Sequence, residues 1–266
     1  MLAPGTAALP LGATFGRRSG DARIGLPEAL RAAYRLAPET DLILTGISED
    51  EPIERWWRVG SEKRTNVIRA MRAAGVGMVT TPNFSLTLNT PRWDDLHAMK
   101  RIALVYAEFI GEGMPAALHV NGRTDNDFAR WTDFVAARPE VTHVAYEFTT
   151  GSRWPRRREQ HAAWLCGLAK NVGRPLHLVV RGGSELFRQF ARAFARVTVL
   201  EADSFMWTMM RQEATLKVGA GIPKEPSPTE NGAPLDALLA INVLARRAAI
   251  EHRLGLELSN GSVGTS

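Results

Sequence analysis

The strongest constraint on the fold is the alternation of short apolar runs with longer amphipathic stretches from residue 41 onward. Six such runs occur, and each of the first five is followed by a stretch long enough to form a helix. Strands separated by helices of this length pair in parallel through crossover connections, and not as hairpins. The six predicted strands are DLILTGI (41–47), VGMVTT (76–81), PAALHVN (115–121), THVAYEF (142–148), PLHLVV (175–180) and VTVLEA (197–202).

This pattern predicts an α/β fold built as a TIM-barrel-like parallel (β/α) repeat. A full barrel needs eight strand–helix units. The missing units would come from residues 21–40 and 208–220, or the barrel is incomplete. A doubly wound open sheet is the alternative, but the first run is followed by no Gly-x-Gly-x-x-Gly motif and the chain has no Walker A loop. The same two absences give no support to NAD or ATP as a cofactor.

The length of 266 residues suits one domain, because α/β barrels occupy about 250 residues. Residues 1–40 are expected to be an N-terminal tail and a first helix, with the Ala/Gly/Pro-rich start of the tail flexible. Residues 41–216 form the barrel-like domain. A Pro/Gly-rich loop at 217–233 and a C-terminal helix at 234–256 complete the same domain.

Composition narrows the class of protein. Hydrophobic residues make up 45% of the chain, which excludes global disorder. No run of about 18 apolar residues predicts a membrane span. The single cysteine, Cys166, excludes an intramolecular disulfide and a Cys-ligated cluster, and we expect a cytoplasmic protein.

The chain is basic, with a net charge of +5 and a pI near 9.8. Arginine outnumbers lysine, and its planar guanidinium binds phosphate through paired hydrogen bonds. A GC-rich genome would also enrich arginine. The charge therefore fits a nucleotide or nucleic-acid partner without establishing one.

Polar side chains gather where the predicted strands end. In parallel α/β folds these ends meet at one edge of the sheet, and active sites lie there. Alternation along a strand puts His119 and Asn121 on one face, and it likewise pairs Glu147 with Thr149. The predicted catalytic residues are Glu147, Asp203, Asn83 and His119, and the predicted substrate-binding residues are Asn121, Arg123, Arg181, Gly182, Gly183, Ser184, Arg156 and Arg157.

Glu147 is the first choice for an acid–base group, because Tyr146 and Phe148 flank it and partly exclude water. An ion pair with Arg181 is the alternative. Asp203 is the second acid, with a helix N-cap as its alternative role. For His119 the alternative role is that of a satisfied core histidine, the commoner role of a buried histidine. Mg²⁺ or Mn²⁺ bound by His119, Glu147 and Asp203 is a further possibility, although the spacing is not diagnostic.

Two segments suggest phosphate binding. The turn from Arg181 to Ser184 could present backbone N–H groups to a phosphate, although its two glycines could also serve a steric need. The run Arg153-Trp154-Pro155-Arg156-Arg157-Arg158 suits a nucleic-acid backbone with one stacked base. Its alternative is a solvated loop that opens the next helix.

The segment Thr81-Pro82-Asn83-Phe84-Ser85 is similar to the Ser-Pro-Asp-Phe-Ser motif of an uncharacterised TIM-barrel-like family found in bacterial, plasmid and phage genomes. Pro91, Arg101, the strand at 115–121 and Thr150-Gly151 extend the resemblance over about residues 80–181. It implies a TIM-barrel-like fold and a role near nucleic acid, with no established reaction. Asn83 replaces the family's aspartate, which implies lost or altered activity if that carboxylate is catalytic.

These observations lead to two functional hypotheses. The first is an enzyme that cleaves a glycosidic bond or a phosphodiester in a nucleotide or nucleic acid, with Glu147 and Asp203 as an acid pair among arginines. The second is a non-catalytic nucleic-acid-binding or mobile-element accessory protein with the same fold. The fold alone does not choose between them.

Overall fold

The structure is a computed structural model, and it describes residues 5–23, 27–86, 91–149, 155–215 and 222–254. Seven strands form one sheet, and every neighbouring pair in it is parallel. The strands are β1 (Thr6–Pro10), β2 (Asp41–Thr45), β3 (Met78–Thr80), β4 (Ala116–His119), β5 (His143–Glu147), β6 (His177–Arg181) and β7 (Arg196–Leu200).

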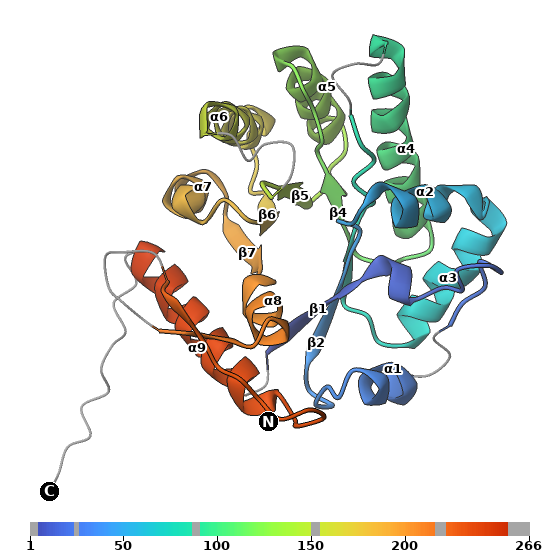
Figure 1. Cartoon of the computed structure of the whole chain (residues 1–266). Coiled ribbons are helices and arrows are strands. Elements are labelled where there is room, and N and C mark those ends of the chain that lie inside the picture. The colour runs from blue at the N-terminus through green and yellow to red at the C-terminus, as the bar shows by residue number, and fades with distance from the viewer. Residues whose placement is uncertain (1–4, 24–26, 87–90, 150–154, 216–221, 255–266) are drawn as a thin grey trace, which may run out of the picture.

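The strands follow one another across the sheet in chain order, from β1 to β7. The order never reverses, as it would in a doubly wound sheet. The sheet curls into a half-barrel whose two ends, β1 and β7, are not paired with each other (Figure 1). The prediction of a TIM-barrel-like parallel repeat with an incomplete barrel is therefore confirmed.

Helices connect the strands and cover the outside of the curled sheet (Figure 1). The predicted helical stretch after the first apolar run is two helices, α2 and α3. The helices of the described residues are η1 (Leu11–Ala13), α1 (Pro27–Ala33), α2 (Asp50–Arg58), α3 (Ser61–Ala73), α4 (Arg92–Gly111), α5 (Asp125–Ala136), α6 (Pro155–Val172), η2 (Ser184–Leu186), α7 (Phe187–Ala193), α8 (Asp203–Met209) and α9 (Asp236–Leu254).

The expectation of a flexible N-terminal tail is wrong. Residues Thr6–Pro10 are the edge strand β1, which pairs with β2 from Thr6–Asp41 to Pro10–Thr45. The segment TAALP gave a weak signal because alanine and proline are poor strand formers. An edge strand tolerates them, since one side of its backbone makes no ladder hydrogen bonds.

The described parts of the two segments expected to supply the missing strands, residues 21–40 and 208–220, add no strand to this sheet. Residues 27–33 form helix α1. Residues Gln212–Ala214 form β8, which pairs antiparallel with β9 (Lys224–Pro226) in a separate two-stranded sheet. The described part of the predicted 217–233 loop therefore contains a short strand, β9. The sequence did not predict this strand because the Pro/Gly content of the segment is typical of a loop.

Strand alternation separates two apolar layers. The large core between sheet and helices includes Leu44, Val79 and Leu118, all fully buried. A smaller layer on the concave face consists of Ile43, Ile47, Ala117, Ala145, Val179 and Leu200, with Met78 packed against it. The small alanines in this inner layer leave room for the sheet to curl.

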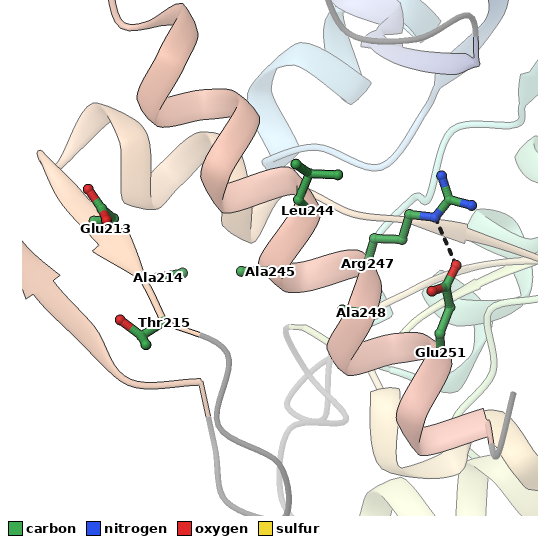
Figure 2. A pocket seen from close by; sticks show the side chains of 8 residues that line it. All are labelled: Glu213, Ala214, Thr215, Leu244, Ala245, Arg247, Ala248 and Glu251. Carbon is green, nitrogen blue, oxygen red and sulfur yellow. Dashed lines mark hydrogen bonds and ion pairs between the residues drawn. The ribbon is translucent and has the colours of Figure 1, made fainter. Parts of the chain in front are cut away.

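The C-terminal helix α9 docks on the β7 side, against α8 and β8. Its Asn242 is fully buried and donates to Thr208 Oγ1 at 2.9 Å while accepting from the Ala214 N–H at 2.8 Å. Beside this contact lies an apolar hollow of about 580 Å³, lined by Ala214, Leu244, Ala245 and Ala248 (Figure 2).

Helix α8 has the opposite burial pattern to an ordinary surface helix, because its polar side chains are buried and its large apolar side chains are exposed. It buries Ser204 and Thr208 toward α9 and exposes Phe205, Met206 and Met209.

In the described part of the chain, no helix combines the length and apolarity that crossing a bilayer requires.

Candidate functional site

The last residues of five consecutive strands are polar. Each stands two positions after a residue of the inner apolar layer or, for β3, after Met78 beside it. Residues two apart on a strand face the same side, so strand periodicity directs all five toward the concave face. They are Thr45, Thr80, His119, Glu147 and Arg181.

The two threonines in this polar layer are used for structure. Thr80 Oγ1 accepts a hydrogen bond from the Gly46 N–H at 2.9 Å, and Thr45 Oγ1 accepts from the Ile47 N–H at 3.2 Å. Both contacts fix the turn that leaves β2. The groups left for chemistry are His119, Glu147 and Arg181.

His119 is buried but not satisfied. Its side chain is 1% exposed, and neither ring nitrogen has a hydrogen-bond partner among the described residues. At the end of β4 the ring also packs against Tyr146, with centroids 5.9 Å apart. A satisfied core histidine would have such partners, as most buried polar groups do, so among the described residues His119 does not fit that alternative.

Burial lowers the pKa of His119 to about 4, and the negative charge of Glu147 acts in the opposite direction by raising it. The imidazole is therefore neutral at pH 7. A neutral ring has one N–H donor and one nitrogen acceptor, so it can hydrogen-bond a ligand in two directions.

Glu147 ends the neighbouring strand and is 6% exposed. Its Oε2 accepts a hydrogen bond from the Thr149 N–H at 3.0 Å and another from Thr149 Oγ1. Arg181 is its register partner on β6, on the same face. This neighbour was expected from the sequence as an ion-pair partner, but no ion pair joins these two described residues within 4.0 Å.

The turn after β6 has a backbone that requires glycine. Gly182 and Gly183 have φ angles of +73° and +66°. A Cβ on Gly182 would lie 2.8 Å from Thr149 Cγ2, and one on Gly183 would lie 3.0 Å from the Phe148 ring. The steric role of the glycine pair is thus evident, and the turn packs on the residues that follow Glu147. Ser184 begins η2 directly after it.

Asn83 and Asn121 are brought together from the ends of β3 and β4. Asn121 Nδ2 donates to Asn83 Oδ1 at 2.7 Å and to the Phe84 carbonyl at 3.0 Å. Asn83 therefore acts as an acceptor that joins two strand-end loops. An aspartate at this position could accept the same bond, so this contact does not require asparagine.

Asp203 lies in a separate cluster at the end of β7. Its carboxylate is 3.1 Å from the Arg246 guanidinium, and Arg246 also pairs with Glu201. Glu201 accepts from the Asp203 and Ser204 N–H groups at 2.8 and 3.2 Å, so Glu201 and not Asp203 caps α8. The alternative role predicted for Asp203, capping of the following helix, is therefore wrong, and Glu201 has that role.

The metal site considered for His119, Glu147 and Asp203 is not assembled. Within the ranges that the structure describes, no three His, Cys, Asp or Glu side chains are grouped to hold a metal ion. Asp203 instead contacts Arg246, on α9.

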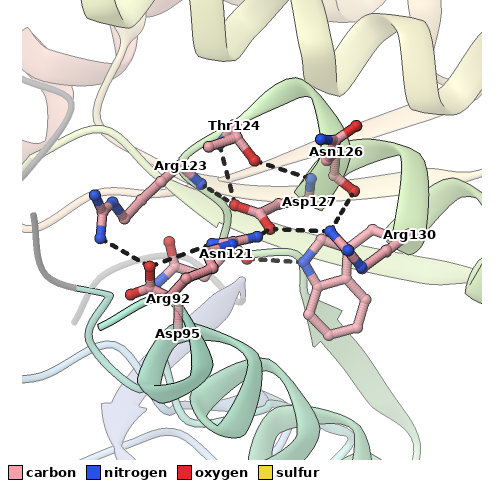
Figure 3. A network of polar contacts seen from close by, with 9 residues as sticks. Arg92, Asp95, Asn121, Arg123, Thr124, Asn126, Asp127 and Arg130 are labelled. Carbon is pink, nitrogen blue, oxygen red and sulfur yellow. Dashed lines mark hydrogen bonds and ion pairs between the residues drawn. The ribbon is translucent and has the colours of Figure 1, made fainter. Parts of the chain in front are cut away.

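Arg123 belongs to a buried polar network that joins the starts of α4 and α5 (Figure 3). Its guanidinium donates to Asp95 at 2.8 Å, and its backbone N–H donates to Asp127 at 2.9 Å. Arg92 contacts both acids, which are 2% and 0% exposed. We interpret these contacts as a structural clamp, and Arg123 is one of its members.

The sequence did carry a signal for this clamp. Thr124 and Asp127 form a capping box at the start of α5, with the Asp127 N–H 3.3 Å from Thr124 Oγ1. The pattern Thr-x-x-Asp before an apolar stretch is its signature. The partners Arg92 and Asp95 come from about 30 residues away, so no local pattern could have identified them.

The predicted arginine run opens helix α6. Arg156 is exposed, Arg157 is half-buried, and Arg158 is paired with Glu185. Arg153, Trp154 and the Thr150-Gly151 pair lie outside the described residues.

Comparisons with known proteins do not extend this picture. No family model matches the chain, and no curated protein matches it. The resemblance through Thr81–Ser85 therefore stays a hypothesis.

We predict that His119→Leu raises stability. The exchange removes two buried nitrogens without partners, and such groups cost about 1–3 kcal/mol each. Because the pKa of His119 is about 4 when folded and about 6.5 when unfolded, the unfolded chain binds more protons between these values. The free energy of unfolding therefore falls as the pH falls from 6.5 to 4, and His119→Leu should weaken this dependence.

Urea unfolding at pH 7 and pH 5 checks the prediction. Some pH dependence should persist in the variant, because burial also lowers the pKa of His161 to about 4. His97→Leu, at an exposed position, is the control and should change little. A His119→Leu protein less stable than the wild type at pH 7 would show that the ring is needed for packing.

Proposed function

We propose that the chain is an enzyme acting on a nucleotide or nucleic acid, with its reaction centred on Glu147 and His119. One observation carries the proposal: a layer of polar residues ends five adjacent strands on the concave face, and it includes a buried histidine with both ring nitrogens unpartnered among the described residues. Buried polar groups at the carboxyl ends of parallel strands are costly unless a ligand uses them.

Each group has a distinct role in this proposal. Glu147 acts as a general acid or base, which transfers a proton to the leaving-group atom of the cleaved bond or removes one from the attacking group. The neutral His119 ring donates one hydrogen bond and accepts another from sugar hydroxyls or the base. Arg181, half-buried beside Glu147, binds a phosphate, with the Gly182-Gly183 turn and Ser184 next to it. Asn121, held by Asn83, borders the same end of the sheet.

Glycosidic-bond chemistry comes first among the possible reactions. It uses two carboxylates and an anion-tolerant pocket. Asp203, the second carboxylate expected from the sequence, is 55% exposed and pairs with Arg246 in a separate cluster, so we propose that Glu147 supplies the acid of this reaction with His119 beside it. Phosphodiester hydrolysis would add Mg²⁺ or Mn²⁺, for which no three-ligand group was found within the described residues.

The test is a product analysis. The protein is incubated with nucleoside monophosphates and with a single-stranded oligonucleotide, with and without Mn²⁺, and products are separated by liquid chromatography and mass spectrometry. Free base indicates glycosidic cleavage, and shortened strands indicate phosphodiester cleavage. Intact substrates together with measurable binding would favour the non-catalytic nucleic-acid-binding alternative.

We also predict salt-sensitive binding of single-stranded nucleic acid through Arg156, Arg157 and Arg158. Changing all three to alanine should weaken binding and lower the slope of log K against log salt by about 0.7 for each phosphate that is no longer neutralised. Because Arg158 is paired with Glu185, we expect the variant to neutralise about one to two fewer phosphates, not three.

Fluorescence anisotropy with a labelled oligonucleotide at several salt concentrations measures this slope. The double variant Arg192→Ala/Arg196→Ala is a control, because both residues are exposed and lie near the start of β7, at the opposite end of the sheet. An unchanged slope in the triple variant would remove the start of α6 from the nucleic-acid surface.

A further inference from the structure

A second, strongly basic cavity lies on the β1–β2 side of the half-barrel. It has a volume of about 420 Å³. Its walls come from the turn after β1 and from helices α2 and α3. Its charged lining residues are Arg17, Arg18, Arg55, Arg58, Lys63 and Glu51.

The turn that carries Arg17 and Arg18 is held in place by the chain around it. The Gly16 N–H donates to the Asp21 carbonyl at 2.8 Å, which closes the turn. Lys63, near the start of α3, donates to the Ser19 carbonyl and lies 3.6 Å from the Asp21 carboxylate. The two arginines are therefore presented by a defined turn.

The charges that line this cavity are unbalanced. Five cationic side chains face it, and Glu51 is the single carboxylate in its described lining. Glu51 already pairs with Arg55 and, at 3.2 Å, with Arg58. Among the described residues, Arg17 and Arg18 have no ion-pair partner. Like charges concentrated in one concavity repel each other and raise the local concentration of anions.

Guanidinium groups recognise phosphate better than other anions of similar charge, because their N–H groups match its oxygens in pairs. The cavity is also wide enough for more than one phosphate group. The turn follows the carboxyl end of β1, and α2 and α3 follow the carboxyl end of β2.

We propose that this cavity binds phosphate groups, either those of a nucleic-acid backbone or those of a free polyphosphate. The site is formed by residues distinct from Glu147, His119 and Arg181, and it does not depend on the reaction proposed for them. In a nucleic-acid enzyme it would hold the strand at one side while the strand ends of β4 to β6 receive the reacting nucleotide.

The experiment compares Arg17→Ala/Arg18→Ala with the wild type and with the control Arg192→Ala/Arg196→Ala. The probes are inorganic tripolyphosphate, followed by titration calorimetry, and a fluorescent 20-nucleotide DNA strand, followed by anisotropy at several salt concentrations. We expect Arg17→Ala/Arg18→Ala to weaken binding of one or both probes at least about tenfold. For the DNA strand, the salt slope should fall by about 1.4, as expected for two phosphates.

The two probes distinguish a nucleic-acid backbone from a free polyphosphate as the source of the phosphate groups. If Arg17→Ala/Arg18→Ala weakens the binding of tripolyphosphate alone, the cavity is a free polyphosphate site, and if it weakens the binding of the DNA strand, the cavity is a backbone site. If both probes bind the double variant as tightly as the wild type, or neither binds the wild type, the assignment is overturned.

Failure of this site and failure of the proposed enzyme are distinguishable. Glu147→Gln should bind both probes like the wild type, because it leaves the cavity intact. If the cavity variant binds normally while Glu147→Gln loses turnover, the cavity assignment fails and the enzyme proposal stands. Thermal unfolding of Arg17→Ala/Arg18→Ala should match the wild type, because both side chains are exposed.

Discussion

Glu147→Gln should reduce turnover of the nucleotide substrate by about 10²- to 10⁴-fold, the usual contribution of a general acid or base. Glutamine keeps the shape of the side chain, and its carbonyl oxygen can still accept the two hydrogen bonds from Thr149. The fold and the affinity for the substrate should therefore change little. Steady-state kinetics on whichever nucleotide the product analysis identifies measures kcat and KM separately.

The same exchange has a spectroscopic consequence. Because the charge of Glu147 raises the pKa of His119, its removal should lower that pKa further below 4. NMR titration of the His119 ring reports this shift independently of activity. A change in turnover without a shift at His119 would mean that the two groups are not electrostatically linked.

Glu251→Gln serves as the control for this experiment. Glu251 lies on α9, where it pairs with Arg247 at 2.8 Å, and it is not part of the proposed site. Its variant should keep full activity. If Glu147→Gln also keeps full activity and differs only slightly in stability, Glu147 has no catalytic role and the binding-protein alternative is favoured.

Most of the sheet could be predicted from the sequence because its central strands are buried on both faces. Strands such as β5 and β6 therefore appear as short continuous apolar runs between helices. The edge strand β1 escaped prediction because only Leu9 of its residues is buried, so its apolar signal is short. The helices between the strands predicted that consecutive strands are parallel neighbours, and the strand order confirms this.

Only those residues of the candidate site that stand at the ends of predicted strands could be predicted from the sequence. The sequence correctly predicted that Glu147 and Arg181 lie on adjacent strands, and the register of β5 and β6 shows that the two residues are partners on the same face. Contacts between distant segments were not predictable. The Asp203–Arg246 pair joins residues 43 positions apart, and the cavity around Arg17 and Arg58 combines two segments that no periodicity connects.

Asp127→Ala should cause the largest loss of stability of any single exchange considered for this chain. The Asp127 carboxylate is 0% exposed and contacts the guanidinium of Arg92, with Arg130 at 3.8 Å. It also accepts the Arg123 and Thr124 N–H groups at 2.9 and 3.1 Å. Removing the carboxylate leaves the Arg123 and Thr124 N–H groups without their acceptor, at a cost of about 1–3 kcal/mol each, while the partly exposed guanidiniums of Arg92 and Arg130 stay in contact with water.

Urea unfolding measures this loss, and two variants identify its cause. Asp127→Asn keeps an oxygen for the capping contacts but loses the charge, so it should lose less stability than the alanine variant. Asp133→Ala, at an exposed position on the same helix, should change the free energy of unfolding by less than about 0.5 kcal/mol. Because the clamp supports the loop that holds Asn121 and does not contact Glu147 among the described residues, Asp127→Asn should retain turnover at low temperature. A variant that stays as stable as the wild type but loses turnover would instead place Asp127 among the functional residues.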